Sequence, residues 1–382
     1  MGGAAISYVD DPSAAFHNPA GLSGVHGLAF LGDISVLLAH ITGSPAASAS
    51  ASGIQSDLIV APFFLAAAAY RVQPWLSLGM GVFPVASGGA DYEYPVPGSD
   101  VYQYDSTSIV FYELTPLLSL NLPKDSILPG ELSVGIGYRV TLSSFERKLG
   151  VREDPRGLNL DLGGADAMGF RAGLQYRPSD YFSLGVVYRN KVTVTNRADD
   201  AIVLGQSATH VELPFVLPAQ LGGGLRSDIQ RFGVAFDAIY TFQEQNERSA
   251  LSALLNGMPA AVPSVFEWQN AFTLRFGFEY RLGPSEQVPL RLGYVFDDQV
   301  TSRAFPSAFG TPPGPTRSLT MGGGYVADSW EVNLALALRT GSTKINPSEL
   351  GPPGACPTCG YSGEYGLSAT GLYVDFSTEL DL

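Results

Sequence analysis

The sequence has few charged residues, few cysteines and no long apolar run. Charged residues make up 15% of its 382 residues, and it contains two Cys and four scattered His. No stretch reaches the roughly 18 consecutive apolar residues of a transmembrane helix. A net charge of −14 without a basic stripe excludes a nucleic-acid-binding protein, because such proteins cluster cations against phosphates. No Ser-His-Asp, P-loop or paired-carboxylate pattern predicts an enzyme, and no motif predicts a metal site or a cofactor.

The chain instead shows a strict two-residue alternation of apolar with polar or small side chains. In residues 169–177, Phe170, Ala172, Leu174 and Tyr176 fall on one face, opposite Gly, Arg and Gln residues. The pattern resumes after a short turn and recurs along the chain. A period of two indicates strands with one apolar face. Repeated many times, and with 44 Gly and 18 Tyr, it is typical of a β-barrel that stands in lipid and has a polar interior.

We therefore predict an all-β fold, a transmembrane antiparallel β-barrel of about fourteen strands. The strands are expected at 27–40, 57–70, 75–84, 106–122, 131–145, 164–177, 181–195, 215–227, 231–243, 267–281, 288–298, 317–326, 330–341 and 364–382. Short and long connections alternate, as in bacterial outer-membrane barrels with short periplasmic turns and long outer loops. The long connections are expected at 41–56, 85–105, 146–163, 196–214, 244–266, 299–316 and 342–363. An even strand number places the C-terminus on the periplasmic side.

These features predict a monomeric protein of the bacterial outer membrane, in contact with lipid and lipopolysaccharide. Residues 1–26 precede the first strand and are too polar for the lipid face, so we expect them to form an N-terminal plug, or hatch, in the lumen. Residues 27–382 then form the barrel. Met1 leads directly into GGAAISYVDD, so we expect a signal peptide to have been removed from this chain or truncated.

The N-terminal residues GGAAISYVDDPSAAFHNPAGLSGV contain the motif Asn18, Pro19 and Ala20 after an Asp-rich stretch. They resemble the hatch of the FadL/TodX family of outer-membrane transporters of long-chain fatty acids and other hydrophobic compounds. The units GFRAGLQYRPSDYFSLGVVYRNKV, LPAQLGGGLRSDIQRFGVAFDAIYTF and LRLGYVFDD…SLTMGGGYVADSWEVNLALAL are also similar to the family, so the resemblance covers nearly the whole chain. Two departures are the missing stretch that reaches the family's inner ligand pocket and the final Leu382, where such barrels usually end in an aromatic residue.

The resemblance implies a gating role for the hatch turn at Asn18, Pro19 and Ala20. Pro19 fixes its own φ and biases Asn18 away from the α conformation, and Asn side chains bond nearby backbone in tight turns. A rigid plug turn without a gating role is the alternative.

The third expected strand carries Gly79, Gly81 and Pro84 within a short space. Glycine within a strand marks a bulge or bend, and proline breaks the ladder. By resemblance to the family, a kink at this strand makes a lateral opening in the barrel wall, which bulky residues at the two glycines would fill. The alternative is a strand that ends at Pro84.

Arg139, Arg171 and Arg189 are expected to point into the lumen. An Arg beside an apolar pocket holds a fatty-acid carboxylate in bidentate geometry; the alternative is a salt-bridged interior that anchors the plug. Cys356 and Cys359 form a CPTC motif in the last long connection. A single CxxC is a weak metal signal, and a disulfide is favoured outside the cell.

The sequence thus predicts a passive outer-membrane channel for long-chain fatty acids or other hydrophobic small molecules. By resemblance, the outer loops at 146–163 and 196–214 capture the substrate, the hatch rearranges, and the substrate leaves laterally through the third strand. A lipase-like barrel enzyme and a general porin remain alternatives. The scattered His residues disfavour the enzyme, and a plug with apolar loops disfavours the porin. The sequence does not decide between a fatty acid and an aromatic hydrocarbon.

Overall fold

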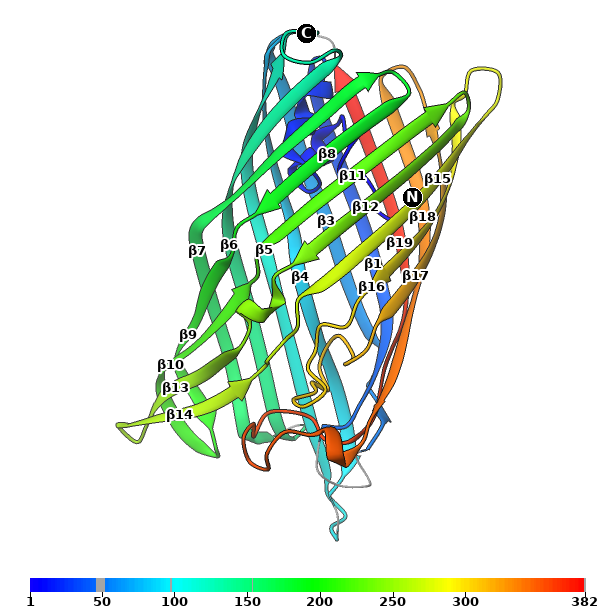
Figure 1. Cartoon of the computed structure of the whole chain (residues 1–382). Helices are drawn as coiled ribbons and strands as arrows, with labels where there is room; N and C mark the ends of the chain where they lie inside the picture. Colours follow the sequence, from blue (N-terminus) through cyan, green and yellow to red (C-terminus); the bar gives the residue numbers. More distant parts are fainter. Residues whose placement is uncertain (46–51, 97, 153, 381–382) are drawn as a thin grey trace.

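A single closed barrel of fourteen antiparallel strands makes up most of the computed structural model, which describes residues 1–45, 52–96, 98–152 and 154–380 (Figure 1). The barrel closes because β1 (Leu28–Gly43) pairs with β3 (Ile59–Gln73) and with β19 (Gly363–Leu380). Between these, the barrel strands follow in the order β4 (Leu76–Pro95), β5 (Tyr102–Leu122), β6 (Glu131–Val151), β7 (Asp154–Ser179), β8 (Phe182–Arg189), β11 (Gln220–Ile229), β12 (Phe232–Thr241), β15 (Ala271–Leu282), β16 (Val288–Asp297), β17 (Thr316–Val326) and β18 (Trp330–Ile345). The predicted architecture is confirmed.

Several strand boundaries differ from the predicted ones. β4 continues to Pro95 instead of ending at Pro84, and β6 and β7 extend beyond the expected ends into the predicted connection 146–163. The strand expected at 181–195 divides after Arg189 into β8, which stays in the barrel, and β9, which leaves it. The barrel wall therefore extends beyond the segments in which the two-residue alternation predicted a lipid-facing side.

Two expected loops are hairpins. Residues 196–214 lie within β9 (Val192–Val203) and β10 (Gln206–Leu217), and residues 244–266 contain β13 (Arg248–Leu255) and β14 (Met258–Val265). These strands extend a sheet from β7 at the end with the long connections (Figure 1). Both tips are two-residue turns with positive φ, at Leu204–Gly205 and Asn256–Gly257. A short strand, β2 (Ile54–Gln55), pairs with the end of β1.

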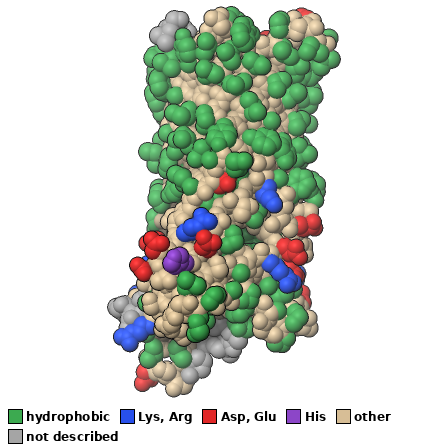
Figure 2. Space-filling view, turned by 90° about the vertical axis from the view of Figure 1, so that its left-hand side faces the viewer, with side chains coloured by type: hydrophobic (Ala, Val, Ile, Leu, Met, Phe, Trp, Pro, Cys, Tyr) green, Lys and Arg blue, Asp and Glu red, His purple; other side chains and the backbone are tan. Residues whose placement is uncertain are grey.

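The barrel wall has an apolar outer face and a polar inner face. Figure 2 shows a broad apolar belt, with charged side chains gathered toward one end. Outward-facing Val186 and Phe276 are 48% and 46% exposed, whereas inward-facing Glu113 and Arg139 are buried. The two-residue alternation therefore gives each strand the predicted parity. Among the described residues, no helix has the length and apolar composition needed to cross a membrane.

Residues 1–26, called the hatch below, lie inside the barrel near the end that carries the short turns and the C-terminus (Figure 1). They contain two 3₁₀ turns, η1 (Pro12–Ala15) and η2 (Pro19–Gly24), each with a proline in its first turn. Their apolar residues form a buried cluster with the inner faces of β1, β3, β4 and β5. The members are Val9, Ala14, Ala15, Leu22, Val25, Ala29, Ala69, Phe83 and Leu117.

Candidate functional site

The hatch turn is fixed by the side chain of Asn18, which is fully buried. Its Oδ1 accepts a hydrogen bond from the Ala20 backbone N at 3.1 Å, which caps η2. Its Nδ2 donates to the carbonyl oxygens of Ile6 at 2.7 Å and Leu174 at 3.1 Å. Pro19 is the first residue of η2. One amide therefore joins two parts of the hatch to β7.

Glycines in the wall allow this close approach. A Cβ on Gly173 would lie 1.9 Å from Asn18 Oδ1, and a Cβ on Gly135 would lie 2.3 Å from the Pro19 carbonyl carbon. Both distances are far inside van der Waals contact, so neither position accepts a side chain while the hatch stays in place. The hatch backbone thus rests directly on the backbone of β6 and β7.

Other strands hold the hatch from the remaining sides. The carboxylate of Asp237 on β12 accepts hydrogen bonds from the backbone N of Ala5 at 2.8 Å and of Ile6 at 3.2 Å. Three further carbonyl oxygens of the hatch accept hydrogen bonds from side chains of the wall. The donors are Arg275 to Gly3 at 3.0 Å, Gln175 to Val9 at 3.1 Å and Ser119 to Ala20 at 2.9 Å. The contacts come from β5, β7, β12 and β15, which surround the lumen.

Two titratable groups of the hatch are shifted by burial. Burial raises the pKa of Asp11 to about 6, while its hydrogen bond from Ser13 opposes the shift. Burial, with the positive charges of Arg275 and Arg171, lowers the pKa of His17 to about 3. At neutral pH the hatch therefore holds an uncharged imidazole beside lumen cations.

The structure brings two of the three predicted arginines to one carboxylate. Glu113 on β5 accepts a 2.9 Å hydrogen bond from Arg139 Nε and a 2.6 Å hydrogen bond from Arg171 Nη2, and all three side chains are buried. Arg171 Nη1 also donates to the carbonyl oxygens of Ala15 and Phe16. Arg139 and Arg171 thus follow the alternative interpretation, a salt-bridged interior that anchors the hatch.

Of the three arginines, Arg189 forms no ion pair with another described residue. It lies directly opposite Arg171 in the β7–β8 register. Its Nε is buried and has no hydrogen-bond partner in the described part of the chain, where no ion pair includes Arg189. Like charges opposite each other on neighbouring strands repel. Three guanidinium groups close to the single carboxylate of Glu113 leave an excess of positive charge at this side of the lumen.

The barrel wall is interrupted between β3 and β4. Their ladder runs only as far as the pair Ala66–Val82, although both strands continue. Farther along, just before β3 begins, the Asp57 backbone N donates to the carbonyl oxygen of Asp91 on β4 at 2.8 Å. On its other side β4 stays paired with β5, with a register shift just after Pro84. Proline has no N–H for a ladder, so the break coincides with Pro84.

Gly79 and Gly81 lie outside this break. They are paired with Ala69 and Ala67 in the intact part of the ladder. A Cβ on Gly79 would come within 2.7 Å of Leu22 Cδ1 in the hatch, and a Cβ on Gly81 within 2.6 Å of the Ala15 Cβ. Bulky residues at the two glycines are therefore not expected to fill the opening. They would push against the hatch, because the hatch packs closely against both glycines.

Aromatic residues close the break from the lumen. Phe83, beside Pro84, is only 1% exposed, and its ring meets that of Phe16 edge to face at a centroid distance of 5.2 Å. The Arg171 guanidinium lies 5.3 Å from the Phe83 ring centroid. Arg171 therefore contacts the backbone of the hatch on one side and side chains of the barrel wall on the other.

The axial path ends in a charged cavity at the short turns. This cavity of about 720 Å³ is lined by residues that include Asp10, Arg226, Asp228, Glu279, Arg281, Arg291 and Glu331. Glu279 accepts hydrogen bonds from Arg226 Nη2 at 2.9 Å and from Arg291 Nε at 2.7 Å. A hydrophobic molecule that left along the axis would have to cross this ion-paired space.

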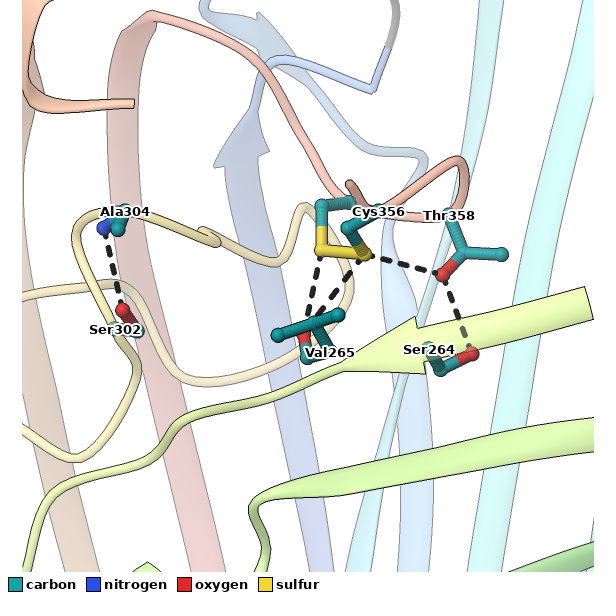
Figure 3. The surroundings of a disulfide bond; sticks show 7 residues. Ser264, Val265, Ser302, Ala304, Cys356 and Thr358 are labelled. Atoms are coloured by element: carbon teal, nitrogen blue, oxygen red, sulfur yellow. Dashed lines mark hydrogen bonds between the residues drawn. A yellow bond between two sulfur atoms is a disulfide. The ribbon is translucent and has the colours of Figure 1, made fainter. Parts of the chain in front are cut away.

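At the opposite end, Cys356 and Cys359 form a disulfide. Figure 3 shows both sulfur atoms against the carbonyl oxygen of Val265, at 3.8 and 3.4 Å, and the Thr358 hydroxyl 3.3 Å from that of Ser264. A disulfide sulfur carries no proton, so the sulfur contacts are not hydrogen bonds. The disulfide loop contacts the end of β14, at the end of the barrel that carries the long connections.

The segments expected to flank a capture groove are joined instead. Leu158 of β7 pairs with Val203 of β9, so β7 and the β9–β10 hairpin form one continuous sheet. Apolar side chains of this sheet pack on one another as follows: Phe145, Leu160, Leu162, Val203, Ala208, Val211, Leu213, Leu251 and Ala253. The apolar composition of these connections thus reflects a hydrophobic core of their own.

Sequence reasoning did not identify Phe16 and Phe83. A signal for Phe83 was present, because strand parity places this large aromatic on the otherwise polar inner face, next to Pro84. Phe16 offered no such signal, since it lies in a segment without periodicity.

No family model and no curated protein matches the chain. Solved structures do. A Pseudomonas aeruginosa FadL homologue is 15% identical, with a TM-score of 0.72 and coverage of 98% of this chain and 96% of that one. The Pseudomonas putida toluene transporter TodX is 18% identical, with a TM-score of 0.73 and coverage of 100% and 97%. The Ralstonia pickettii toluene transporter TbuX is 16% identical, with a TM-score of 0.68 and coverage of 100% and 96%. The chain therefore has the fold of the FadL and TodX proteins, along its whole length.

Proposed function

We propose that this chain is a passive outer-membrane channel of the FadL/TodX family for hydrophobic small molecules. The observation that carries the proposal is the break at Pro84. It is the place where the wall is unpaired between β3 and β4, and the hatch covers its inner side with apolar residues. The neighbours include a FadL homologue and toluene transporters, which agrees with a hydrophobic cargo.

Transfer energetics favour a lateral exit over an axial one. An apolar molecule gains about 25 cal/mol for each Å² of surface that it removes from water. A route along the axis would return that surface to water in the charged cavity beside Glu279. A route past Phe83 and Pro84 leads from an apolar cluster directly into the apolar belt. The same argument disfavours a general porin, whose lumen is an open aqueous path.

The hatch acts as the gate in this proposal. Movement of Phe16 away from Phe83 uncovers the break, and Arg171 is the link because it holds Ala15, Phe16 and Glu113 together. The turn at Asn18, Pro19 and Ala20 supports the gate by fixing the rest of the hatch to the wall. Gating therefore requires only a local rearrangement around η1.

The unpaired Arg189 favours a cargo with a carboxylate, such as a long-chain fatty acid. A carboxylate there would offset the repulsion between Arg189 and Arg171 and would satisfy the Arg189 Nε. A neutral hydrocarbon would satisfy neither. An enzymatic role has less support, because the four His residues are scattered along the chain and the uncharged His17 belongs to the hatch.

Uptake by whole cells tests the proposal. The chain is expressed in a bacterial strain without its own hydrophobic-compound channels, and entry of radiolabelled oleate, toluene and a hydrophilic sugar is followed. We expect faster entry of oleate than with an empty vector, and no acceleration of the sugar. Faster entry of the sugar without either hydrophobic probe would contradict the channel proposed here. Lipid extraction and mass measurement on the purified protein identify any retained cargo.

A variant separates the two cargo classes. Arg189→Gln removes the unpaired charge and should slow oleate entry while leaving toluene entry unchanged. Arg231→Gln is the matched control, because Arg231 lies in an exposed ion pair with Glu286 at a short turn. If Arg189→Gln slows the entry of oleate and of toluene equally, the residue acts on the structure of the barrel and not on the carboxylate.

A further inference from the structure

An aromatic pair also covers the break in the wall from outside. The rings of Phe64 on β3 and Tyr112 on β5 are stacked, with a centroid distance of 6.3 Å and an interplanar angle of 25°. Both side chains belong to the outward face and are more than a third exposed, at 39% and 38%. They are therefore on the bilayer side of the wall.

The strand register places this pair directly over Pro84. Pro84 is the partner of Tyr112 in the β4–β5 ladder. Continuing the last β3–β4 pair, Ala66–Val82, by two residues places Phe64 opposite Pro84 at the point where pairing has ended. The three residues thus form a row across three strands, centred on Pro84, which is paired with β5 but not with β3.

The pair is unusual for the wall because β4 separates its two strands. Strands two apart in a sheet lie roughly 9–10 Å from each other, so the rings lean toward one another across β4. Where other outward aromatic pairs of the described residues join two barrel strands, those strands are neighbours, as for Phe170 and Tyr188 at 5.9 Å. Along the rest of the wall, ladder hydrogen bonds hold neighbouring strands together. At the break, the stacked rings hold β3 beside the β4–β5 pair instead.

We propose that Phe64 and Tyr112 form the outer gate of the lateral exit. They close the wall over Pro84 from the bilayer side, while Phe16 and Phe83 close it from the lumen, and the substrate leaves when the outer rings separate. This inference rests on the proposed function. It makes the exit a passage with two aromatic closures, one attached to the hatch and one built into the wall.

Removal of the rings tests the gate. In Phe64→Ala/Tyr112→Ala, the initial rate of radiolabelled oleate entry should rise about two- to tenfold, which corresponds to the loss of one stacked pair. Phe170→Ala/Tyr188→Ala is the matched control, with the same loss of outward aromatic surface on neighbouring strands, and should keep the unmodified rate. Heat-modifiability on gels verifies that each barrel is folded.

Cross-linking gives the decisive result, because a covalent link between the two positions takes the place of the stacked rings. Phe64→Cys/Tyr112→Cys is treated with a short bifunctional methanethiosulfonate, and oleate entry should fall to that of an empty vector and recover with reductant. Unmodified protein treated in the same way controls for the reduction of Cys356–Cys359. If the cross-linked protein takes up oleate at the unmodified rate, the outer gate is overturned and the channel stands. If the unmodified protein takes up neither oleate nor toluene, the proposed function fails and the gate fails with it.

Discussion

Neighbouring residues of one strand have opposite roles in this wall. On β7, Gly173 lies under the hatch, where any Cβ would meet Asn18, while Leu174 is 38% exposed on the outer face. The alternation of a strand sends consecutive side chains to opposite faces, so a change of one position decides between lipid and hatch. The effect of a substitution at these positions follows from the face alone.

An arginine at each position should separate the two effects. Leu174→Arg places a charge against acyl chains and should cost about 2–4 kcal/mol of barrel stability near the membrane midplane. Gly173→Arg enters the lumen, so the barrel should remain folded while the hatch loses protection. Denaturant unfolding in lipid vesicles measures the first effect, and hydrogen exchange of residues 1–26 measures the second. If Leu174→Arg unfolds like the unmodified chain, the face assigned to Leu174 is wrong.

At the residue scale, the sequence predicted which way the side chains point but not which ion pairs they form. Strand parity was sufficient to place Arg139 and Arg171 in the lumen, because side-chain direction depends only on local alternation. Their ion pairs depend on the register between β5, β6 and β7, and on where the hatch carbonyls lie. Neither is encoded in a local pattern, so the anchoring role of Arg171 became visible only in three dimensions.

At the scale of elements, the barrel strands were predictable and the outer sheet was not. Each barrel strand separates lipid from lumen, which imposes a period of two. The β9–β10 hairpin has no such separation: it contributes to an apolar core, and a register shift near His210, with a φ of 52°, interrupts its alternation. The Asn256–Gly257 pair was the missed signal for the second hairpin, since such pairs favour the turn of a two-residue loop.

The hairpin tips should be the protease-sensitive points of the outer surface. A protease added to intact cells should cut at Leu204 or Met258, which are 66% and 69% exposed next to the two tips, and should spare the paired strands between them. Cleavage sites are read by mass spectrometry of the fragments. Cuts at the short turn 177–180 in intact cells would mean that the orientation is reversed.

The hatch turn is an element that depends on one side chain. Asn18→Ala removes the bonds to Ile6, Leu174 and Ala20 and leaves buried backbone groups unpaired. We expect a loss of about 1–3 kcal/mol of local hatch stability. Amide exchange of residues 1–26 should accelerate while the unfolding transition of the barrel stays in place. Unchanged exchange would mean that the wall glycines and the apolar cluster hold the hatch without Asn18.

For the whole molecule, we propose that the hatch determines whether the lumen is an aqueous pore. The inner face of the wall is polar, and charged residues such as Glu279 and Arg291 remain there with or without the hatch. Apolar hatch residues fill the space next to β1, β3, β4 and β5. A hydrophobic cargo and a small ion should therefore respond in opposite ways when the hatch is removed.

Deletion of residues 1–26 behind an export signal should convert the barrel into an ion-conducting pore. Without the hatch, water enters the polar lumen, and planar bilayers should record stepwise conductance, whereas the unmodified chain should record little. Oleate uptake should lose its selectivity over a hydrophilic sugar, because the sugar gains the axial path that the hatch had blocked. Heat-modifiability confirms that the deleted form is a folded barrel. If the unmodified chain already conducts ions as well as the deletion does, the lumen is open and the hatch is not its plug. If only the deletion conducts, a hydrophobic molecule that crosses the unmodified chain must leave by a path that ions cannot use. The break beside Pro84 is that path.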